Sequence, residues 1–251
     1  MIRVVNINKS FSGVNVLENI SVTFKKGKTN LIIGQSGSGK TVLLKSIIGL
    51  HDIDDGEIWY EDTLFNGLDF EGKKALRQNM GVLFQGSALF DSLTVEQNVM
   101  FPMDMFTNKS MEEKREQVNL CLKRVNIVNA NELFPSELSG GMRKRVAIAR
   151  AIVLNPSYLL CDEPNSGLDP KNSILIDGLI KELTEEYEMT TVVNTHDMNS
   201  VMEIGENVVF IHNGKKYWEG SNKDILKSDC DTLNDFIFAN SLAKQLIVRR
   251  N

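Results

Sequence analysis

The chain has 251 residues, of which 42% are hydrophobic and 24% are charged, and its formal net charge is −5. This composition is typical of an ordinary globular protein and excludes collagen-like, coiled-coil and intrinsically disordered classes. The acidic balance also argues against phosphate-backbone binding as the main task, so we expect no nucleic-acid partner.

Insertion into a membrane and disulfide formation are not expected. Uninterrupted apolar runs are at most four residues long, whereas a membrane-spanning helix needs roughly 20. The first residues, MIRVVNINKS, lack a charged and then apolar leader, so we expect no signal peptide. Cys121, Cys161 and Cys230 are far apart and form no CxxC pair, which is typical of reduced thiols in a cytoplasmic protein.

The N-terminal region has the pattern of β-structure. Partly alternating runs rich in β-branched residues predict strands over residues 2–7, 14–24 and 57–60. A shorter apolar strand is predicted at residues 31–33. Directly after it, apolar residues between Leu43 and Ile48 recur at helical spacing.

From about residue 87 to residue 156 the pattern is mostly helical. Ser110 and Glu113 form a capping box, in which each side chain satisfies a free backbone N–H group of the other. An apolar stripe at helical spacing follows, made of Val118, Cys121, Leu122 and Val125.

Beyond Pro156, predicted strands and helices alternate. The elements are a strand at 158–161, a helix at 170–187, a strand at 191–193, a short helix at 198–204 and a strand at 208–211. Asn213-Gly214 then suits a type I′ hairpin turn. Strand–helix alternation on both sides of a helical insert predicts an α/β core with a helical subdomain.

The segment Gly34-Gln35-Ser36-Gly37-Ser38-Gly39-Lys40-Thr41 fits the phosphate-binding pattern G-x-x-x-x-G-K-[ST] completely. Its glycines let successive N–H groups point at phosphate oxygens, and the following helix adds the positive end of its dipole. We expect Lys40 to reach the β- and γ-phosphates and the Thr41 hydroxyl to bind Mg²⁺. The segment therefore predicts nucleotide binding.

Two acidic residues, Asp162 and Glu163, end the apolar strand at 158–161. The carboxyl ends of parallel strands commonly carry the chemistry of such folds. Asp162 is placed to hold Mg²⁺ through its water shell, and Glu163 to act as a general base or to orient the attacking water. Alone, the pair would fit a helix N-cap equally well, but the phosphate loop upstream favours catalysis.

The segment Leu138-Ser139-Gly140-Gly141-Met142 precedes a helix-compatible run that reaches Leu154. Ser139 is a good N-cap, and the glycines beside it leave N–H groups free for an anion. The pentapeptide resembles the LSGGQ signature of ATP-binding cassette (ABC) ATPases. Gln85, in Leu83-Phe84-Gln85, resembles the Q-loop glutamine of the same family.

Further motifs of that family follow in its order. Ser166-Gly167-Leu168-Asp169 resembles the D-loop, His196 resembles the switch histidine, and Phe11 stands where the family carries an aromatic that stacks on adenine. Each residue also has an ordinary alternative: Gln85 on the surface, His196 in a loop, Asp169 as an N-cap before Pro170, and Phe11 in the core. Order and spacing favour the functional interpretation.

The resemblance covers about residues 2–225. It implies a P-loop NTPase (RecA-like) core with an N-terminal antiparallel β subdomain and an inserted α-helical subdomain. The expected divisions are an ABC ATPase domain at 1–225, with its core and β subdomain at 1–86 and 157–225 and its helical subdomain at 87–156, and a helical tail at 226–251. We expect the tail to pack on the cassette or to reach a dimer partner.

The resemblance also implies ATP and Mg²⁺ as cofactors and a head-to-tail homodimer that encloses two ATP molecules. Ser139, Gly140 and Gly141 of one copy would then contact the γ-phosphate held by the other. The implied metal-binding residues are Thr41, Gln85 and Asp162. The implied catalytic residues are Lys40, Glu163 and His196.

Two departures from the family pattern stand out. Met142 replaces the usual glutamine of the signature, and Phe11 lacks the hydroxyl of the more usual tyrosine. Neither change touches the Ser139 and glycine donors, so we expect hydrolysis to survive. The basic residues Arg143, Lys144, Arg145 and Arg150 are expected on a solvated helix face rather than at a nucleic-acid surface.

A transport ATPase is favoured over a soluble ABC ATPase, because the chain carries one cassette and only a short insert. It is expected at the cytoplasmic face of the inner membrane, touching the membrane only through a multi-span permease. The segments 84–95 and 135–145 are similar to those of MCE-type phospholipid transport ATPases, which would add an MCE-domain lipid-binding partner. An ATPase for amino acids or for lipoprotein release is the alternative.

A docking groove for the permease is expected after Gln85. Its candidate lining is apolar and flexible, which suits a docking surface. The candidates are Leu89, Phe90, Phe101, Met103, Met105 and Phe106. At least half of them are expected in the core of the helical subdomain instead.

Overall fold

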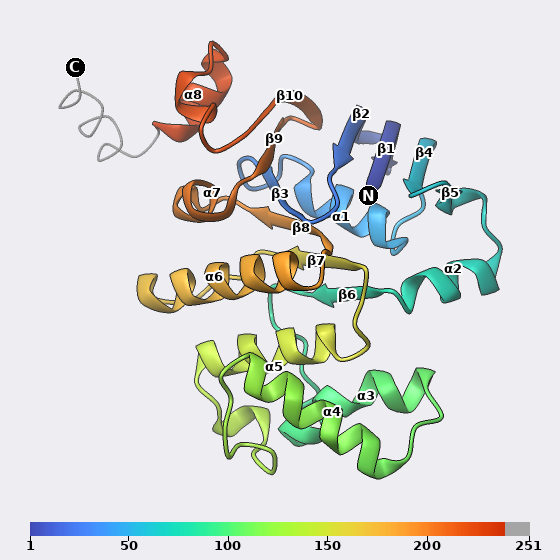
Figure 1. Ribbon diagram of the computed structural model, residues 1–251. Helices are drawn as coiled ribbons and strands as arrows, with labels where there is room; N and C mark the ends of the chain where they lie inside the picture. Colours follow the sequence, from blue (N-terminus) through green and yellow to red (C-terminus); the bar gives the residue numbers. More distant parts are fainter. Residues whose placement is uncertain (239–251) are drawn as a thin grey trace.

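The computed structural model describes residues 1–238, in which helices pack on and between two β-sheets (Figure 1). The smaller sheet is antiparallel and has the strand order β2-β1-β4-β5. Its strands are β1 (Ile2–Phe11), β2 (Val14–Phe24), β4 (Asp55–Tyr60) and β5 (Thr63–Leu64). The predicted antiparallel β region near the N-terminus is therefore confirmed, with β1 longer than expected.

The larger sheet has the strand order β10-β9-β3-β8-β7-β6. Neighbouring strands are parallel except for β10, which returns antiparallel to β9. The strands are β3 (Lys28–Ile33), β6 (Met80–Leu83), β7 (Tyr158–Asp162), β8 (Thr190–Thr195), β9 (Asn207–His212) and β10 (Lys215–Gly220). Asn213 and Gly214 both have positive φ, as a type I′ turn between β9 and β10 requires.

Both faces of the parallel strands are covered, so these strands are almost continuously buried. Alternate residues point to opposite faces. Ile32 and Leu160 pack against α1 (Lys40–Ile48) and the antiparallel sheet, whereas Leu31 and Cys161 join the core formed with the remaining helices. The fold is thus an α/β P-loop core with an antiparallel β subdomain.

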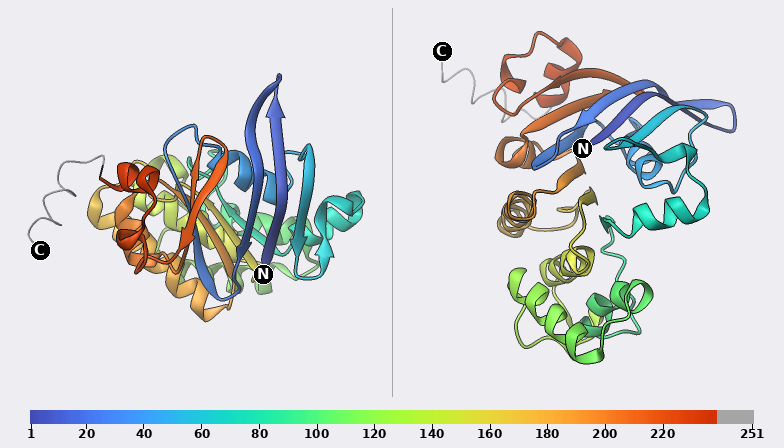
Figure 2. Two further views of the ribbon diagram at one scale, coloured as in Figure 1. Left: turned by 90° about the horizontal axis from the view of Figure 1, so that it is seen from above. Right: turned by 45° about the vertical axis from the view of Figure 1, so that its right-hand side comes forward.

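Three helices form a group that lies away from the antiparallel sheet (Figure 1 and the right-hand view of Figure 2). They are α3 (Val95–Phe106), α4 (Met111–Arg124) and α5 (Gly140–Ile152). The predicted capping box before α4 is confirmed: Glu113 N donates to Ser110 Oγ at 3.2 Å, and Ser110 N donates to Glu113 Oε2 at 2.7 Å. Thr94 and Gln97 form an equivalent box before α3, which the sequence interpretation missed.

The other helices cover the sheets. They are α2 (Phe70–Arg77), α6 (Pro170–Glu186), α7 (Met198–Ile204) and α8 (Asp231–Ile237), with short 3-10 turns at Phe65–Gly67, Pro135–Glu137 and Ile225–Lys227. In α8, Leu233 and Ile237 are buried in the core, and the Phe236 ring lies 5.4 Å from that of Phe210. The tail therefore packs on its own cassette as far as residue 238. Leu242, Leu246 and Ile247 of the predicted tail helix lie outside the described residues.

Strand order determines where chemistry can occur. β3, β8 and β7 are adjacent and parallel, so their carboxyl ends meet at one edge of the sheet. The phosphate loop follows β3, Asp162 ends β7, and Asn194 and Thr195 end β8. No helix within residues 1–238 has the length and apolar composition that crossing a bilayer requires.

Candidate active site

The predicted phosphate loop, Gly34–Thr41, joins β3 to α1 in a conformation that depends on glycine. Gly34 has φ +152°, and a Cβ there would lie 2.1 Å from the Ile211 carbonyl oxygen. Gly39 has φ +104°, and a Cβ there would lie 2.8 Å from the Val16 carbonyl oxygen. Any larger residue at either position would push the loop away from the strands beside it.

The inner and outer parts of this loop differ in exposure. Gln35, Ser36 and Gly37 are exposed at its tip, whereas Ser38 is buried. The Ser38 hydroxyl has no hydrogen-bond partner within the part of the chain that the structure describes. A buried polar group without a partner is uncommon, and here it lies in a loop that can surround a phosphate.

Lys40 is only 6% exposed, and its ammonium group donates to the carbonyls of Gly34 at 2.9 Å and Gln35 at 3.0 Å. Burial lowers the pKa of Lys40, while the carboxylates of Glu163 and Asp162 oppose that shift. A cation is therefore fixed inside the phosphate loop, where it can meet the charge of a nucleotide.

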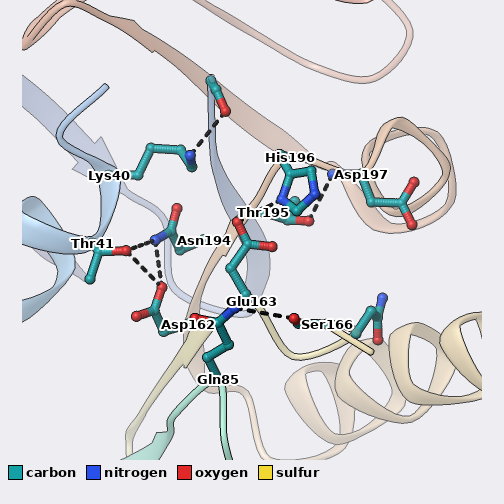
Figure 3. Close-up of polar contacts among 12 residues, drawn as sticks. Lys40, Thr41, Gln85, Asp162, Glu163, Ser166, Asn194, Thr195, His196 and Asp197 are labelled. Atoms are coloured by element: carbon teal, nitrogen blue, oxygen red, sulfur yellow. Dashed lines mark hydrogen bonds and ion pairs between the residues drawn. The ribbon is translucent and has the colours of Figure 1, made fainter. Parts of the chain in front are cut away.

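Asp162, Thr41 and Asn194 form a hydrogen-bonded triangle at the carboxyl edge of the sheet (Figure 3). The Thr41 hydroxyl and the Asn194 amide both donate to Asp162 Oδ1, at 3.2 and 2.7 Å. The Asn194 amide also donates to Thr41 Oγ1 at 3.2 Å, while its own buried Oδ1 is unpartnered among residues 1–238. These are hard oxygen ligands of the kind that Mg²⁺ prefers, so the residues fit a magnesium site.

Asn194 was not identified from the sequence. Its signal was weak, because the amide directly follows the apolar pair Val192-Val193, where the predicted strand at 191–193 ended. A buried strand usually reads as continuously apolar, and a polar residue at its carboxyl end is a candidate site residue.

Glu163 and His196 face each other on the loops that follow β7 and β8. Glu163 Oε1 lies 2.9 Å from His196 Nδ1, and the Glu163 backbone N–H donates to the Asn194 carbonyl at 2.8 Å (Figure 3). Glu163 has φ 49°, which is unusual for a residue with a side chain. Such strain, of about 1–3 kcal/mol, is found mostly where a side chain must be aimed at a reaction.

Gln85, predicted as a metal-binding residue, points elsewhere. Its amide nitrogen donates to Ser166 Oγ at 3.1 Å, and within the described chain no hydrogen bond joins it to Thr41 or Asp162. The contact does link the loop after β6 to the predicted D-loop (Figure 3). The role of Gln85 in metal binding stays a prediction.

The predicted signature residues contact the predicted D-loop region rather than the phosphate loop. Ser139 caps α5 by accepting a hydrogen bond from Met142 N at 3.2 Å. A Cβ on Gly140 would lie 3.6 Å from Leu168, and one on Gly141 would lie 3.1 Å from Asn172. Within residues 1–238, no hydrogen bond joins Ser139, Gly140 or Gly141 to the phosphate loop. The chain therefore does not bring these two motifs together by itself.

Asp169 acts as the N-cap of α6, as its ordinary alternative predicts. Its carboxylate accepts a hydrogen bond from Asn172 N at 3.1 Å and a second one from the Asn172 side chain. These bonds lower the pKa of Asp169. The capping role can coexist with a role in a D-loop.

Phe11 is 41% exposed, so the alternative that it is a core residue is wrong. Its ring lies edge-on to that of His51, with 5.4 Å between the ring centroids. Lys9 Nζ lies 5.2 Å from the centroid of Phe11. An exposed aromatic ring can stack on a base, so the role of Phe11 in nucleotide binding stays a prediction.

The prediction that Arg143, Lys144, Arg145 and Arg150 form a solvated helix face is wrong for Lys144 and Arg150. Lys144 is 4% exposed, and its ammonium group donates to the Gln85 carbonyl. Arg150 is partly buried and donates to two other carbonyls of the same loop. Helical periodicity could not reveal this, because the carbonyls belong to a loop far away in sequence.

A groove of about 510 Å³ lies beside this loop. Of the six candidate lining residues, Phe90, Phe101 and Phe106 line it. Met103 is buried in the core, Leu89 packs against that core, and Met105 is exposed away from the groove. The expectation that at least half of the candidates are core residues was therefore wrong by one residue.

Comparison with known proteins gives consistent matches. The sequence model of the family described as "ABC transporter" matches residues 17–166. The methionine import ATP-binding protein MetN of Clostridium tetani is 38% identical over 225 residues, covering 90% of this chain and 70% of that protein. The probable ribonucleotide transport ATP-binding protein mkl of Mycobacterium bovis is 34% identical over 236 residues, covering 94% and 66%.

Solved structures agree with these matches. A dimeric structure of a post-hydrolysis state of the ATP-binding cassette MJ0796, bound to ADP and Pi, is 33% identical with a TM-score of 0.81. The similarity covers 88% of this chain and 99% of that one. The cbiO1 protein of Clostridium perfringens, described as part of the ABC transporter complex cbiONQ, is 28% identical with a TM-score of 0.84, covering 98% of each chain.

Proposed function

This chain belongs to the ABC transporter family, and from that premise we propose that it is the ATP-hydrolysing subunit of a membrane transporter. The observation that carries the proposal is the meeting of Lys40, Asp162 and Glu163 at one edge of the parallel sheet. ATP and Mg²⁺ are its cofactors, as in the ABC ATPase cassettes that it resembles.

The residues at this edge divide the work of hydrolysis. Lys40 and the N–H groups of the phosphate loop bind the β- and γ-phosphates. Thr41 and Asp162 would hold Mg²⁺, which when bound neutralises charge on the phosphate oxygens. Glu163 orients a water molecule and takes its proton as the water oxygen attacks the γ-phosphorus and the bond to ADP breaks. His196, held at 2.9 Å from Glu163, keeps that carboxylate aimed at the water.

The site needs a second copy of the chain. The signature residues offer an N-capping hydroxyl and helix N–H groups, and within residues 1–238 no hydrogen bond joins them to the phosphate loop. In a head-to-tail dimer, Ser139, Gly140 and Gly141 of one copy would meet the γ-phosphate bound by the other. Both copies would then stabilise the charge that develops during hydrolysis. Loss of the γ-phosphate would release the two halves.

The dimer can be tested with a variant that cannot complete hydrolysis. Glu163→Gln should double its mass in light scattering when Mg-ATP is added, and should stay monomeric with ADP. The matched control is Glu163→Gln combined with Ser139→Arg, which should stay monomeric with ATP. A protein that never pairs with ATP, or that pairs equally well without nucleotide, would contradict the proposal.

The cargo is proposed to be phospholipid, moved by an MCE-type system. Support comes from segments 84–95 and 135–145, which are similar to those of MCE-type ATPases. The first of these segments contributes Phe84, Ala88 and Phe90 to the lining of the groove. The relative MetN instead carries a name that indicates methionine import, and this is the second candidate. A soluble ABC ATPase outside transport is the third.

Isolation of the chain from membranes distinguishes these candidates. An MCE-domain protein and a multi-span permease in the complex would support lipid transport. A permease with a methionine-binding protein would favour methionine import, and a ribosome or DNA complex would contradict transport altogether.

We also propose that the chain lies at the cytoplasmic face of the inner membrane. Its proposed division is a cassette at 1–225, with the helical part at 87–156, and a tail at 226–251.

A further inference from the structure

The loop from Gln85 to Phe90, called here the Gln85 loop, is held by the helix that begins at the signature. Lys144 lies in the second turn of α5, and its buried ammonium group donates to the Gln85 carbonyl. Burial lowers the pKa of Lys144, with Cys161 and the acidic residues of the site acting in the opposite direction. Burying an ammonium group is costly, and a neutral side chain would fill the same space without that cost.

Arg150, in the last turn of α5, holds the other half of the Gln85 loop. Its guanidinium group donates to the carbonyls of Ser87 at 2.9 Å and Ala88 at 2.8 Å. Ser87 and Ala88 have φ of 64° and 48°, so two consecutive residues with side chains are in the left-handed region. A residue with a side chain is strained in this region, and the surrounding contacts must offset that strain. The Arg150 hydrogen bonds supply part of that stabilisation.

Arg150 also faces the groove. Its guanidinium carbon lies 5.8 Å from the centre of the Phe90 ring, and Phe90 lies 4.7 Å from Phe101. All three residues line the groove of about 510 Å³. A molecule that occupies the groove would therefore touch the residue that keeps the Gln85 loop in its strained shape.

The opposite end of α5 is the signature. Ser139 caps α5. The 13 residues of α5 span about 20 Å of rigid structure. Lys144 and Arg150 thus tie the Gln85 loop to the element that presents Ser139. The side chain of Gln85 reaches the D-loop through Ser166.

From these contacts we infer that Lys144 and Arg150 are positioning residues. They hold the Gln85 loop and the signature helix in a fixed position relative to each other. Gln85 serves the ATP site of its own chain, and Ser139 serves the site of the second copy. Because the loop and the helix are held together, the position of Gln85 then depends on that of Ser139. The inference rests on the proposed ATPase function. It gives Lys144 and Arg150 a positioning role in both the phosphate-loop half and the signature half of the ATP sites.

A double-mutant cycle tests whether Lys144 acts through Gln85. Lys144→Met should lower kcat by about 10-fold and leave the dissociation constant of a fluorescent ATP analogue within about twofold, because the phosphate loop is untouched. Lys144→Met combined with Gln85→Ala should be no slower than Gln85→Ala alone, since residues that act as one unit are not additive. Lys144→Arg, which keeps a cationic donor, should recover kcat to within about threefold of the parent.

The matched control is Arg145→Met. Arg145 is the next residue of the same helix and also donates to backbone carbonyls, those of Val125 and Asn126, but it does not touch the Gln85 loop. Its kcat should stay within about twofold of the parent. Additive effects in the cycle, or an equal loss of kcat in Arg145→Met, would overturn the inference.

Two further measurements keep the test decisive. If thermal unfolding shows that Lys144→Met does not fold, Lys144→Gln replaces it in the cycle, because an amide still donates but carries no charge. The kcat of Lys144→Gln should lie between those of the parent and Gln85→Ala. Arg150→Lys should also lower kcat while leaving nucleotide affinity intact, because a single ammonium nitrogen cannot occupy both positions from which the two guanidinium nitrogens donate. Absence of ATPase activity in the parent protein would instead contradict the proposed function, so the two failures are distinguishable.

Discussion

The two halves of the proposed ATP site differ in how much of their chemistry one chain completes. At the carboxyl edge of the parallel sheet, residues from α1, β7 and β8 already contact one another, as in the triangle of Thr41, Asp162 and Asn194. At the signature, Ser139 satisfies only its own helix, and the glycines beside it contact the D-loop region. One half is preorganised within the chain, and the other is presented outward.

This difference explains how such a fold can convert hydrolysis into motion. A site completed within one chain would hydrolyse ATP without any change in assembly. A site that lacks half of its donors must recruit a second copy before the charge of the transition state is fully stabilised. Assembly and chemistry are then coupled, and the predictions below separate the contributions of the two halves.

The largest effect is expected at the preorganised half. Glu163→Gln keeps the shape of the side chain but removes the carboxylate that takes a proton from water. We expect kcat to fall by roughly 10²–10⁴-fold. Nucleotide affinity should stay nearly unchanged, because the phosphate loop contacts are intact. A steady-state ATPase assay checks this, and unchanged turnover would remove Glu163 from the mechanism.

The signature half of the site should be as necessary for hydrolysis as the half that contains Glu163. Its contribution can be measured separately with a variant of its own. Ser139→Arg blocks the signature and should lower kcat by at least about 10²-fold, as the loss of a transition-state donor does. Its phosphate loop and Glu163 are intact, whereas Glu163→Gln retains an intact signature. A mixed dimer of the two variants therefore contains one complete composite site.

Mixing the two inactive proteins should thus restore activity, up to roughly a quarter of the parent level if copies pair at random in a symmetric dimer. The control is Ser139→Arg mixed with the double variant Glu163→Gln/Ser139→Arg, which offers no intact signature and should stay inactive. Failure of the first mixture to regain activity, while both proteins still bind ATP, would show that the two halves do not meet in trans.

A smaller effect is expected within the preorganised half. Asn194→Leu removes the amide that orients Asp162 Oδ1 and Thr41, which are the proposed magnesium ligands. Loss of such an orienting group typically weakens metal binding by about 10–100-fold. The Mg²⁺ concentration for half-maximal ATPase activity should rise by that factor. Asn199→Leu, at an exposed amide of α7, is the matched control and should leave it unchanged.

The same contrast determines what the sequence could predict. The phosphate loop is a local motif, so its geometry followed from eight consecutive residues. The edge that unites Asp162 with His196 followed from strand–helix alternation, because parallel strands end together. Asn194 was missed because the predicted strand ended at residue 193, whereas β8 continues to Thr195.

Contacts between segments distant in sequence could not be predicted. Lys144 and Arg150 belong to a helix with several basic residues, and nothing local indicates that these two side chains contact the Gln85 loop. The pairing of Gln85 with Ser166 crosses 81 positions of the chain. Burial and charge together, rather than periodicity, reveal these links.

The smallest effect concerns the D-loop, which lies between the two halves. Asp177 on α6 is 2% exposed. The Asn165 amide donates to the Asp177 carboxylate at 2.8 Å and also to Ser200 Oγ at 3.1 Å. Burial raises the pKa of Asp177 to about 6 from its ordinary 3.8, with further repulsion from Asp197 and Glu203. The folded protein therefore binds more protons than the unfolded chain between these two values, so this group lowers stability as pH rises from about 4 to 6.

Asp177→Asn removes that cost and keeps an oxygen that can accept from Asn165. We expect the variant to be more stable than the parent by about 1–3 kcal/mol at pH 8, with the gain vanishing below about pH 4. Urea unfolding at both pH values measures it. Asp169→Asn is the control, because hydrogen bonds from Asn172 lower the pKa of that exposed carboxyl. That control should show no gain at pH 8. An equal gain for Asp177→Asn at pH 4 and pH 8 would mean that Asp177 destabilises the folded protein through packing rather than through its charge.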